Sequence, residues 1–94
     1  MKLKIFPRAK IETKDAIYFY EARKKGLGLG FLNEIKRTYA FILEQPELFP
    51  ERKDQFREAI VSHFPYIIIF KIESNSAVIT SIFHTSRNPN KKPL

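Results

Sequence analysis

Two histidines and two arginines are the side chains of this sequence best placed to do chemistry. His63 and His84 are the groups whose ordinary pKa lies closest to neutrality, and both fall at the expected ends of strands. Arg57 lies near the start of one expected strand, and Arg87 follows another. We expect Arg57 and His84 to meet at one edge of the sheet, where they would hold a phosphate or a partner carboxylate. The alternative for each histidine is an ordinary surface position.

The sequence predicts neither a metal site nor a bound cofactor. Cysteine is absent, and no His-x-x-x-His pair or carboxylate pattern has the spacing of metal ligands. All three glycines lie in the run Gly26-Leu27-Gly28-Leu29-Gly30, which joins two expected helices. A phosphate-binding loop instead joins a strand to a helix and carries a following Lys and Ser or Thr. We therefore interpret the glycines as a turn, and we expect no small-molecule substrate.

Positive charge gathers at both ends of the chain, whose formal net charge is +7 at pH 7. Residues 1–14 carry Lys2, Lys4, Arg8, Lys10 and Lys14 against the single acid Glu12, and residues 84–94 carry Arg87, Lys91 and Lys92 without an acid. If the two ends meet, they form a basic face suited to RNA, DNA or an acidic protein. The alternative is that the charge serves solubility alone.

The chain is expected to form one soluble, cytoplasmic domain over residues 1–94, with no membrane contact. Its first residues alternate lysine and hydrophobe, whereas a signal peptide needs an unbroken apolar stretch. The longest apolar run, residues 66–70, is far shorter than the roughly 20 residues that cross a bilayer. The hydrophobic content of 44% is ample for a core, and the lack of cysteine suits a reducing compartment.

Hydrophobic periodicity divides the chain into strands, helices and a polar tail. A period of two indicates a strand, and a period near 3.6 indicates a helix. The expected strands are residues 2–6, 56–63, 66–73 and 77–84, and the expected helices are residues 8–25 and 28–44. Pro46 and Pro50 interrupt the chain between the second helix and the second strand. Residues 85–94 form a polar, basic tail.

The resulting order β-α-α-β-β-β predicts an α+β fold. The short glycine turn must fold the two helices into an antiparallel hairpin, which packs on a mainly antiparallel sheet. The apolar block at residues 66–70 is typical of a central strand. The expected buried stripes are Ala9, Thr13, Ala16, Ile17 and Tyr20 in the first helix, and Phe31, Ile35, Tyr39 and Ile42 in the second.

Several segments together resemble the RelE/ParE family of type II toxins, and they follow the family's order from about residue 7 to residue 90. The segments are Phe19-Tyr20-Glu21, Gly26-Leu27-Gly28, Gln45-Pro46-Glu47-Leu48-Phe49-Pro50, Phe64-Pro65-Tyr66 and His84-Thr85-Ser86-Arg87-Asn88-Pro89. The last two look like the signature of the ParE side of the family. The fold that the resemblance implies agrees with the fold expected from periodicity.

The resemblance implies a growth-inhibiting toxin of a type II toxin–antitoxin system, neutralised by a cognate antitoxin. ParE-like members inhibit DNA gyrase and are associated with plasmid stabilization, whereas RelE-like members cleave mRNA on the ribosome. RelE-like cleavage often uses an acid–base side chain near the C-terminus. Residues 88–94 contain no Tyr, His, Asp or Glu. The sequence therefore favours the ParE-like function, which is not enzymatic.

The functional residues differ between the alternatives. A partner-binding toxin would use Arg57, His63, Tyr66, His84, Arg87, Lys91 and Lys92. A ribosome-dependent endoribonuclease would use His84, Arg57 and Arg87 as catalytic groups. A third alternative is a decayed toxin that retains only antitoxin binding, because family members often carry an arginine pair where this chain has Phe56-Arg57.

Overall fold

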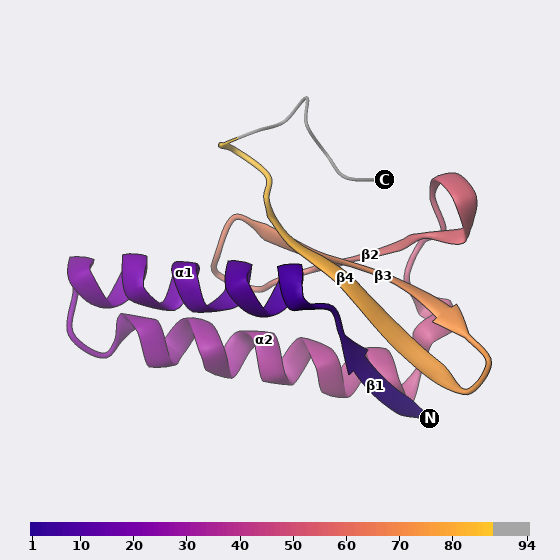
Figure 1. The fold of residues 1–94 in the computed structure, drawn as a ribbon. Helices are drawn as coiled ribbons and strands as arrows, with labels where there is room; N and C mark the ends of the chain where they lie inside the picture. The colour runs from indigo at the N-terminus through magenta and orange to yellow at the C-terminus, as the bar shows by residue number, and fades with distance from the viewer. Residues whose placement is uncertain (88–94) are drawn as a thin grey trace.

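The fold is a helical hairpin packed against a four-stranded sheet (Figure 1). A computed structural model describes residues 1–87. The strands are β1 (Lys2–Ile5), β2 (Arg57–Ile60), β3 (Tyr66–Glu73) and β4 (Ser76–His84); the helices are α1 (Pro7–Arg23) and α2 (Leu27–Glu44), with short 3₁₀ turns η1 (Pro46–Leu48) and η2 (Lys53–Gln55) before β2. Within this described part, neither helix is long and apolar enough to cross a bilayer.

The sheet has the strand order β1-β4-β3-β2. β2 pairs with β3, and β3 with β4, in antiparallel fashion, whereas β1 joins β4 in parallel. The predicted α+β fold with a mainly antiparallel sheet is confirmed. β3 is a central strand, and its apolar block from Tyr66 to Phe70 is buried throughout, as its continuous apolar sequence predicts.

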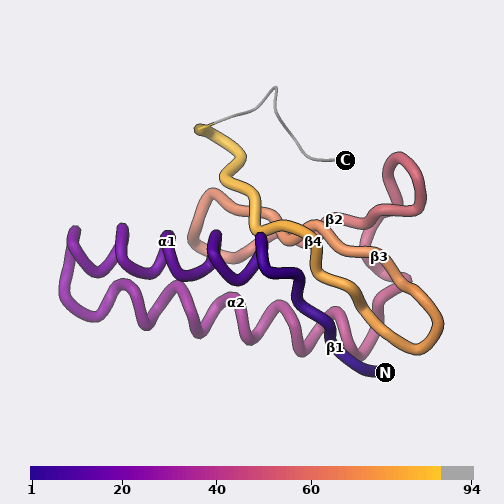
Figure 2. The backbone as a smooth tube through the Cα atoms, in the orientation of Figure 1, coloured from indigo at the N-terminus to yellow at the C-terminus, as the bar shows by residue number. Residues whose placement is uncertain are grey.

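The two helices run side by side (Figure 2), with α1 packed against α2 and β4. The whole predicted stripe of α2 is buried, namely Phe31, Ile35, Tyr39 and Ile42. Of the five residues expected to be buried in α1, only Ala9 and Ala16 are, whereas Thr13, Ile17 and Tyr20 are half-buried. Helix α1 therefore contributes two buried alanines, with Ile17 and Tyr20 packed against the edge of the core, and α2 supplies the large buried side chains.

A carboxylate holds the turn between the helices. Glu21 of α1 accepts hydrogen bonds from the N–H of Gly26, at 3.0 and 3.1 Å, and from the N–H of Gly28, at 3.0 Å. Such an acceptor satisfies free amides at a helix N-terminus, where negative charge is favourable. Gly26 has φ +89°, which favours glycine, and a Cβ on Gly28 would lie 2.7 Å from the carbonyl oxygen of Ile17. The glycine run is a structural turn, as predicted.

We expect Gly28→Ala to lower the free energy of unfolding by about 1–3 kcal/mol, because the added methyl overpacks the contact between the helices. Gly30→Ala is the matched control, since a Cβ there meets no atom within 4 Å. Alanine has the higher helix propensity, so Gly30→Ala should stabilise the fold by up to about 1 kcal/mol. Urea unfolding followed by circular dichroism measures both values. Equal effects of the two substitutions would contradict this account of the turn.

Strand β2 ends at Ile60, three residues before the predicted boundary. The N–H of Val61 donates to the carbonyl oxygen of Tyr66 at 3.0 Å, and His63 has φ +70°. Residues 61–65 therefore form a tight turn into β3, and the chain leaves the strand geometry that periodicity alone predicted.

Candidate functional site

A cleft of about 410 Å³ lies between α1 and the second half of β4. Side chains from α1, from the ends of β3 and β4, and from the turn after β4 line this α1–β4 cleft. They are Arg8, Glu12, Asp15, Ala16, Phe19, Tyr66, Ile82, Phe83, His84 and Arg87. Three of the predicted site residues, Tyr66, His84 and Arg87, thus come together here.

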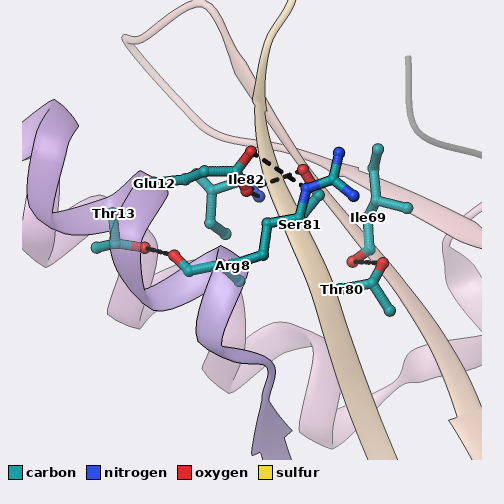
Figure 3. Close-up of polar contacts among 8 residues, drawn as sticks. Arg8, Glu12, Thr13, Ile69, Thr80, Ser81 and Ile82 are labelled. Carbon is teal, nitrogen blue, oxygen red and sulfur yellow. Dashed lines mark hydrogen bonds and ion pairs between the residues drawn. The ribbon is translucent and has the colours of Figure 1, made fainter. Parts of the chain in front are cut away.

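The cleft exists because β1 covers only part of β4. β1 pairs with β4 from Ser76 to Ile79, and beyond Ile79 no described strand lies on that side. A carboxylate of α1 takes the place of a strand: Glu12 accepts the N–H of Ile82 at 2.9 Å and the hydroxyl of Ser81 at 3.0 Å (Figure 3). Such charge-assisted hydrogen bonds are stronger than neutral ones. Glu12 therefore fixes α1 against the open edge of β4.

An extra residue in β4 decides which side chains face the helices. The register between β3 and β4 shifts at Thr80, whose hydroxyl donates to the carbonyl oxygen of Ile69 at 3.1 Å (Figure 3). A bulge interrupts the alternation of a strand by one residue, so Ile79 and Ile82 both reach the core although they are three positions apart. Because alternation resumes after the bulge, His84 lies on the same side of the strand as Ile82.

We expect Glu12→Ala to lower the free energy of unfolding by about 2 kcal/mol, because the N–H of Ile82 loses its acceptor in a partly buried position. Glu12→Gln keeps an oxygen acceptor and should cost about half as much. Asp15→Ala is the control, since Asp15 lines the same cleft but forms no ion pair within residues 1–87. Its effect should stay within about 0.5 kcal/mol. Comparable losses for Glu12→Ala and Asp15→Ala in urea unfolding would contradict this role of Glu12.

His84, Tyr66 and Arg87 form a connected cluster at the end of β4. The ring of His84 lies edge-on to that of Tyr66, with centroids 4.9 Å apart. His84 Nδ1 accepts the N–H of Ser86 at 3.2 Å and of Arg87 at 2.8 Å, and the guanidinium of Arg87 donates to Tyr66 Oη at 3.4 Å. Burial, and then the charge of Arg87, lower the pKa of His84. His84 Nδ1 therefore accepts hydrogen bonds from the turn that contains Arg87 and stabilises it.

Arg57 lies at the other end of the sheet, so the predicted meeting of Arg57 and His84 is wrong. Arg57 pairs with Phe70 of β3, whereas His84 pairs with Tyr66, near the opposite end of that strand. In an antiparallel meander, the first and third strands run in the same direction, so the end of β4 is level with the end of β2. Arg57 instead donates to the carbonyl oxygen of Phe49 at 2.8 Å and fastens the loop before β2.

The remaining predicted site residues do not contribute to the cleft. His63 lies in the turn between β2 and β3, where its Nδ1 is 3.2 Å from Oε2 of Glu34 on α2. Lys91 and Lys92 lie outside the described residues. Within residues 1–87, no group of three or more His, Asp or Glu side chains could hold a metal ion.

Sequence reasoning missed Glu12, although the sequence carries a signal for it. Glu12 follows Ala9 by three residues and precedes Ala16 by four, which places it beside the predicted buried stripe of the first helix. A carboxylate in such a position needs a polar partner. Nothing in the sequence pattern indicated that Arg87 approaches the ring of Phe19, near which Arg23 also lies, because Phe19 and Arg87 are more than sixty positions apart.

A family profile matches nearly the whole chain. Residues 3–89 match the family described as "ParE toxin of type II toxin-antitoxin system, parDE". The chain belongs to this ParE toxin family. A solved structure, "Chromosomal ParDE TA system from P. aeruginosa", shares its fold with a TM-score of 0.69 and 21% identity, over 89% of this chain and 95% of that one. Curated proteins gave no match to the sequence.

The ParE assignment confirms the family resemblance, and the structure shows how the family-like segments are connected. Phe64-Pro65-Tyr66 meets the segment that begins at His84, because Thr85 N–H donates to the carbonyl oxygen of Pro65 at 2.9 Å. Phe49, from the proline-flanked loop, packs edge-on against Phe70 with centroids 5.7 Å apart. In this ParE-family toxin, the Phe64-Pro65-Tyr66 segment and the segment that begins at His84 thus stabilise each other, and the proline-flanked loop is fixed to β3.

Proposed function

We propose that this ParE-family toxin inhibits DNA gyrase by binding it, in the cytoplasm, and that a cognate antitoxin neutralises it. The main support for binding over RNA cleavage is that Arg57 and His84 lie apart along β3 and do not meet. A ribonuclease needs an acid–base group beside cations that stabilise the charge of the transition state. Here Arg57 instead binds the loop that contains Phe49, far from His84, and Nδ1 of His84 binds the turn that contains Arg87. This geometry supports a protein-binding surface rather than an endoribonuclease site.

The surface that we assign to gyrase binding is the cluster of Tyr66, His84 and Arg87. These residues come from the two segments that look like the ParE side of the family, and they contact one another directly. Tyr66 is buried, with 5% of its surface exposed, so it holds the cluster to the core. Arg87 is exposed and presents its charge to a partner. Arginine and tyrosine are both favoured at the centres of protein interfaces.

Induction of the toxin alone is expected to lower DNA synthesis before protein synthesis, measured by pulse labelling, and the purified toxin should block gyrase supercoiling. His84→Asn should retain this inhibition, because an asparagine oxygen can accept the N–H two residues further on. His84→Ala removes the acceptor of both the Ser86 and the Arg87 N–H and should weaken inhibition at least about tenfold. Arg37→Gln, on the exposed side of α2, is the control for loss of a positive charge.

Two other outcomes would contradict the gyrase proposal. Early loss of protein synthesis with cleaved mRNA, and equal inactivity of His84→Asn and His84→Ala, would indicate an endoribonuclease, because asparagine cannot transfer a proton. Normal growth with soluble toxin present would indicate a decayed toxin that retains only antitoxin binding.

A second surface supports the proposed antitoxin partner. A groove of about 520 Å³ runs between α1 and α2, and its lining is largely apolar. Ile17, Leu32, Ile35 and Tyr39 contribute apolar surface, and Lys10, Lys14 and Lys36 add positive charge. Tyr18, also in the lining, is 64% exposed. An apolar groove with lysines fits an amphipathic, acidic segment of an antitoxin.

Charge reversal in this groove is expected to weaken antitoxin binding. Lys14→Glu and Lys36→Glu should each raise the dissociation constant about tenfold, mainly through slower association at low salt. Lys53→Glu, in the loop before β2, makes the same charge change away from the groove. Surface plasmon resonance with the cognate antitoxin measures the rates. Equal effects of Lys53→Glu and the groove variants would show that only net charge matters.

A further inference from the structure

Two arginines share one aromatic ring at the mouth of the α1–β4 cleft. The guanidinium carbon of Arg23 lies 4.5 Å from the ring centroid of Phe19, and that of Arg87 lies 5.2 Å from the same centroid. Arg23 ends α1, whereas Arg87 follows β4, so tertiary folding brings them together. Phe19 is 39% exposed, which leaves part of the ring open to a partner.

These two arginines differ from the others in their ion pairing. Arg8, Arg37, Arg52 and Arg57 each have a carboxylate within 4.0 Å, on Glu12, Glu34, Glu58 and Glu51 respectively. Within residues 1–87, Arg23 and Arg87 have none. Both guanidinium carbons lie within 5.2 Å of one ring centroid, so they are no more than about 10 Å apart. Two cations this close without a carboxylate partner favour an anion beside them.

The charges of both arginines also act on the hydroxyl of the neighbouring Tyr20. Burial, and then the neighbouring Tyr66, raise the pKa of Tyr20, and the charges of Arg87 and Arg23 both oppose that rise. The ring of Tyr20 lies edge-on to Phe19, with centroids 5.2 Å apart. Both arginines therefore act on one small region of the surface, which rests on buried aromatic side chains.

We infer that Phe19, Arg23 and Arg87 form a binding site for a carboxylate side chain of a partner protein, here called the arginine clamp. A guanidinium presents planar N–H groups that match a carboxylate, often in bidentate pairs. The phenyl ring orients both guanidinium groups and shields one side of them from water. Tyr66 Oη, which accepts from Arg87 at 3.4 Å, holds the second arginine in place.

The surroundings of the clamp favour a protein over a nucleic acid. Asp15 and Glu12 line the adjoining cleft, which also contains Phe19 and Arg87. A nucleic acid carries a phosphate on every nucleotide, so its backbone would meet these two carboxylates, whereas a single Asp or Glu side chain need not. Leu29, at the same end of the hairpin, is 60% exposed. Exposed apolar and aromatic side chains beside arginine are typical of protein interfaces.

Titration of the purified full-length toxin with a synthetic peptide tests this inference without gyrase or antitoxin. The probe is an acetylated and amidated peptide of twelve residues in which Glu alternates with Ser, and its Gln counterpart is the uncharged control. Resonances of arginine Nε–Hε groups in nitrogen-15 correlation spectra should shift for Arg23 and Arg87 and stay in place for Arg37. The clamp would be detected in this way even if the toxin did not act on gyrase.

Variants separate the clamp from general electrostatic attraction. Arg23→Gln combined with Arg87→Gln should raise the dissociation constant of the Glu peptide at least about tenfold. Arg37→Gln combined with Lys53→Gln removes the same net charge elsewhere and should change it less than about twofold. Phe19→Leu keeps an apolar side chain but removes the ring face, and should weaken binding about threefold. Each variant is compared with the wild type in urea unfolding.

Two results would overturn the inference. Equal weakening by both double variants would show that net charge alone attracts the peptide. Tighter binding of a twelve-nucleotide single-stranded DNA than of the Glu peptide, with shifts at Arg23 and Arg87, would assign the site to nucleic acid instead.

Discussion

The carboxylate of Glu12 accepts hydrogen bonds from the part of β4 that β1 does not pair with, and the cleft between α1 and β4 depends on this contact. β1 accompanies β4 only to Ile79, which would leave the rest of that edge open to unwanted pairing with another chain. The N–H of Ile82 on this edge donates to Glu12 at 2.9 Å, so a side chain of α1 provides the acceptor that a longer β1 would otherwise provide. A helix is wider than a strand, so the backbone of α1 lies further from β4 than that of a paired strand would. The space left between them is the α1–β4 cleft.

Packed aromatic rings give the functional surface a rigid base. The rings of Tyr20 and Phe64 have centroids 4.8 Å apart, those of Phe31 and Tyr66 are 5.0 Å apart, and Tyr66 continues to His84. These contacts join both helices to β3, β4 and the turn before β3. Aromatic pairs contribute about 0.5–1.5 kcal/mol each beyond their buried area. Phe19 and Arg23 of the arginine clamp thus stand on a packed helix, and Arg87 lies in a turn that is held by hydrogen bonds to His84 and Tyr66.

Helix α1 forms one wall of two chemically different surfaces. Lys10, Lys14 and Tyr18 line the groove shared with α2, whereas Arg8, Asp15 and Phe19 line the cleft shared with β4. Lysine is a flexible point charge, and arginine a planar group suited to one fixed carboxylate. The groove is therefore adapted to a long amphipathic segment, and the clamp to a single acidic side chain. A partner that occupied the groove would lie beside the cleft.

The helices and strands could be predicted from the sequence, apart from the early end of β2, because hydrophobic periodicity and proline act locally. The stripe of α2, the apolar β3 and the glycine turn were all predicted. The sequence also identified the family, since the order of the segments is a property of the chain. Tertiary structure decided which distant residues meet. The pairing register placed Arg57 away from His84, and the bulge at Thr80 decided which side chains at the end of β4 face the helices. The packing of α1 on β4 brought Arg87 to the ring of Phe19, beside which Arg23 lies. Register and packing depend on contacts between residues far apart in the chain, which local patterns do not contain.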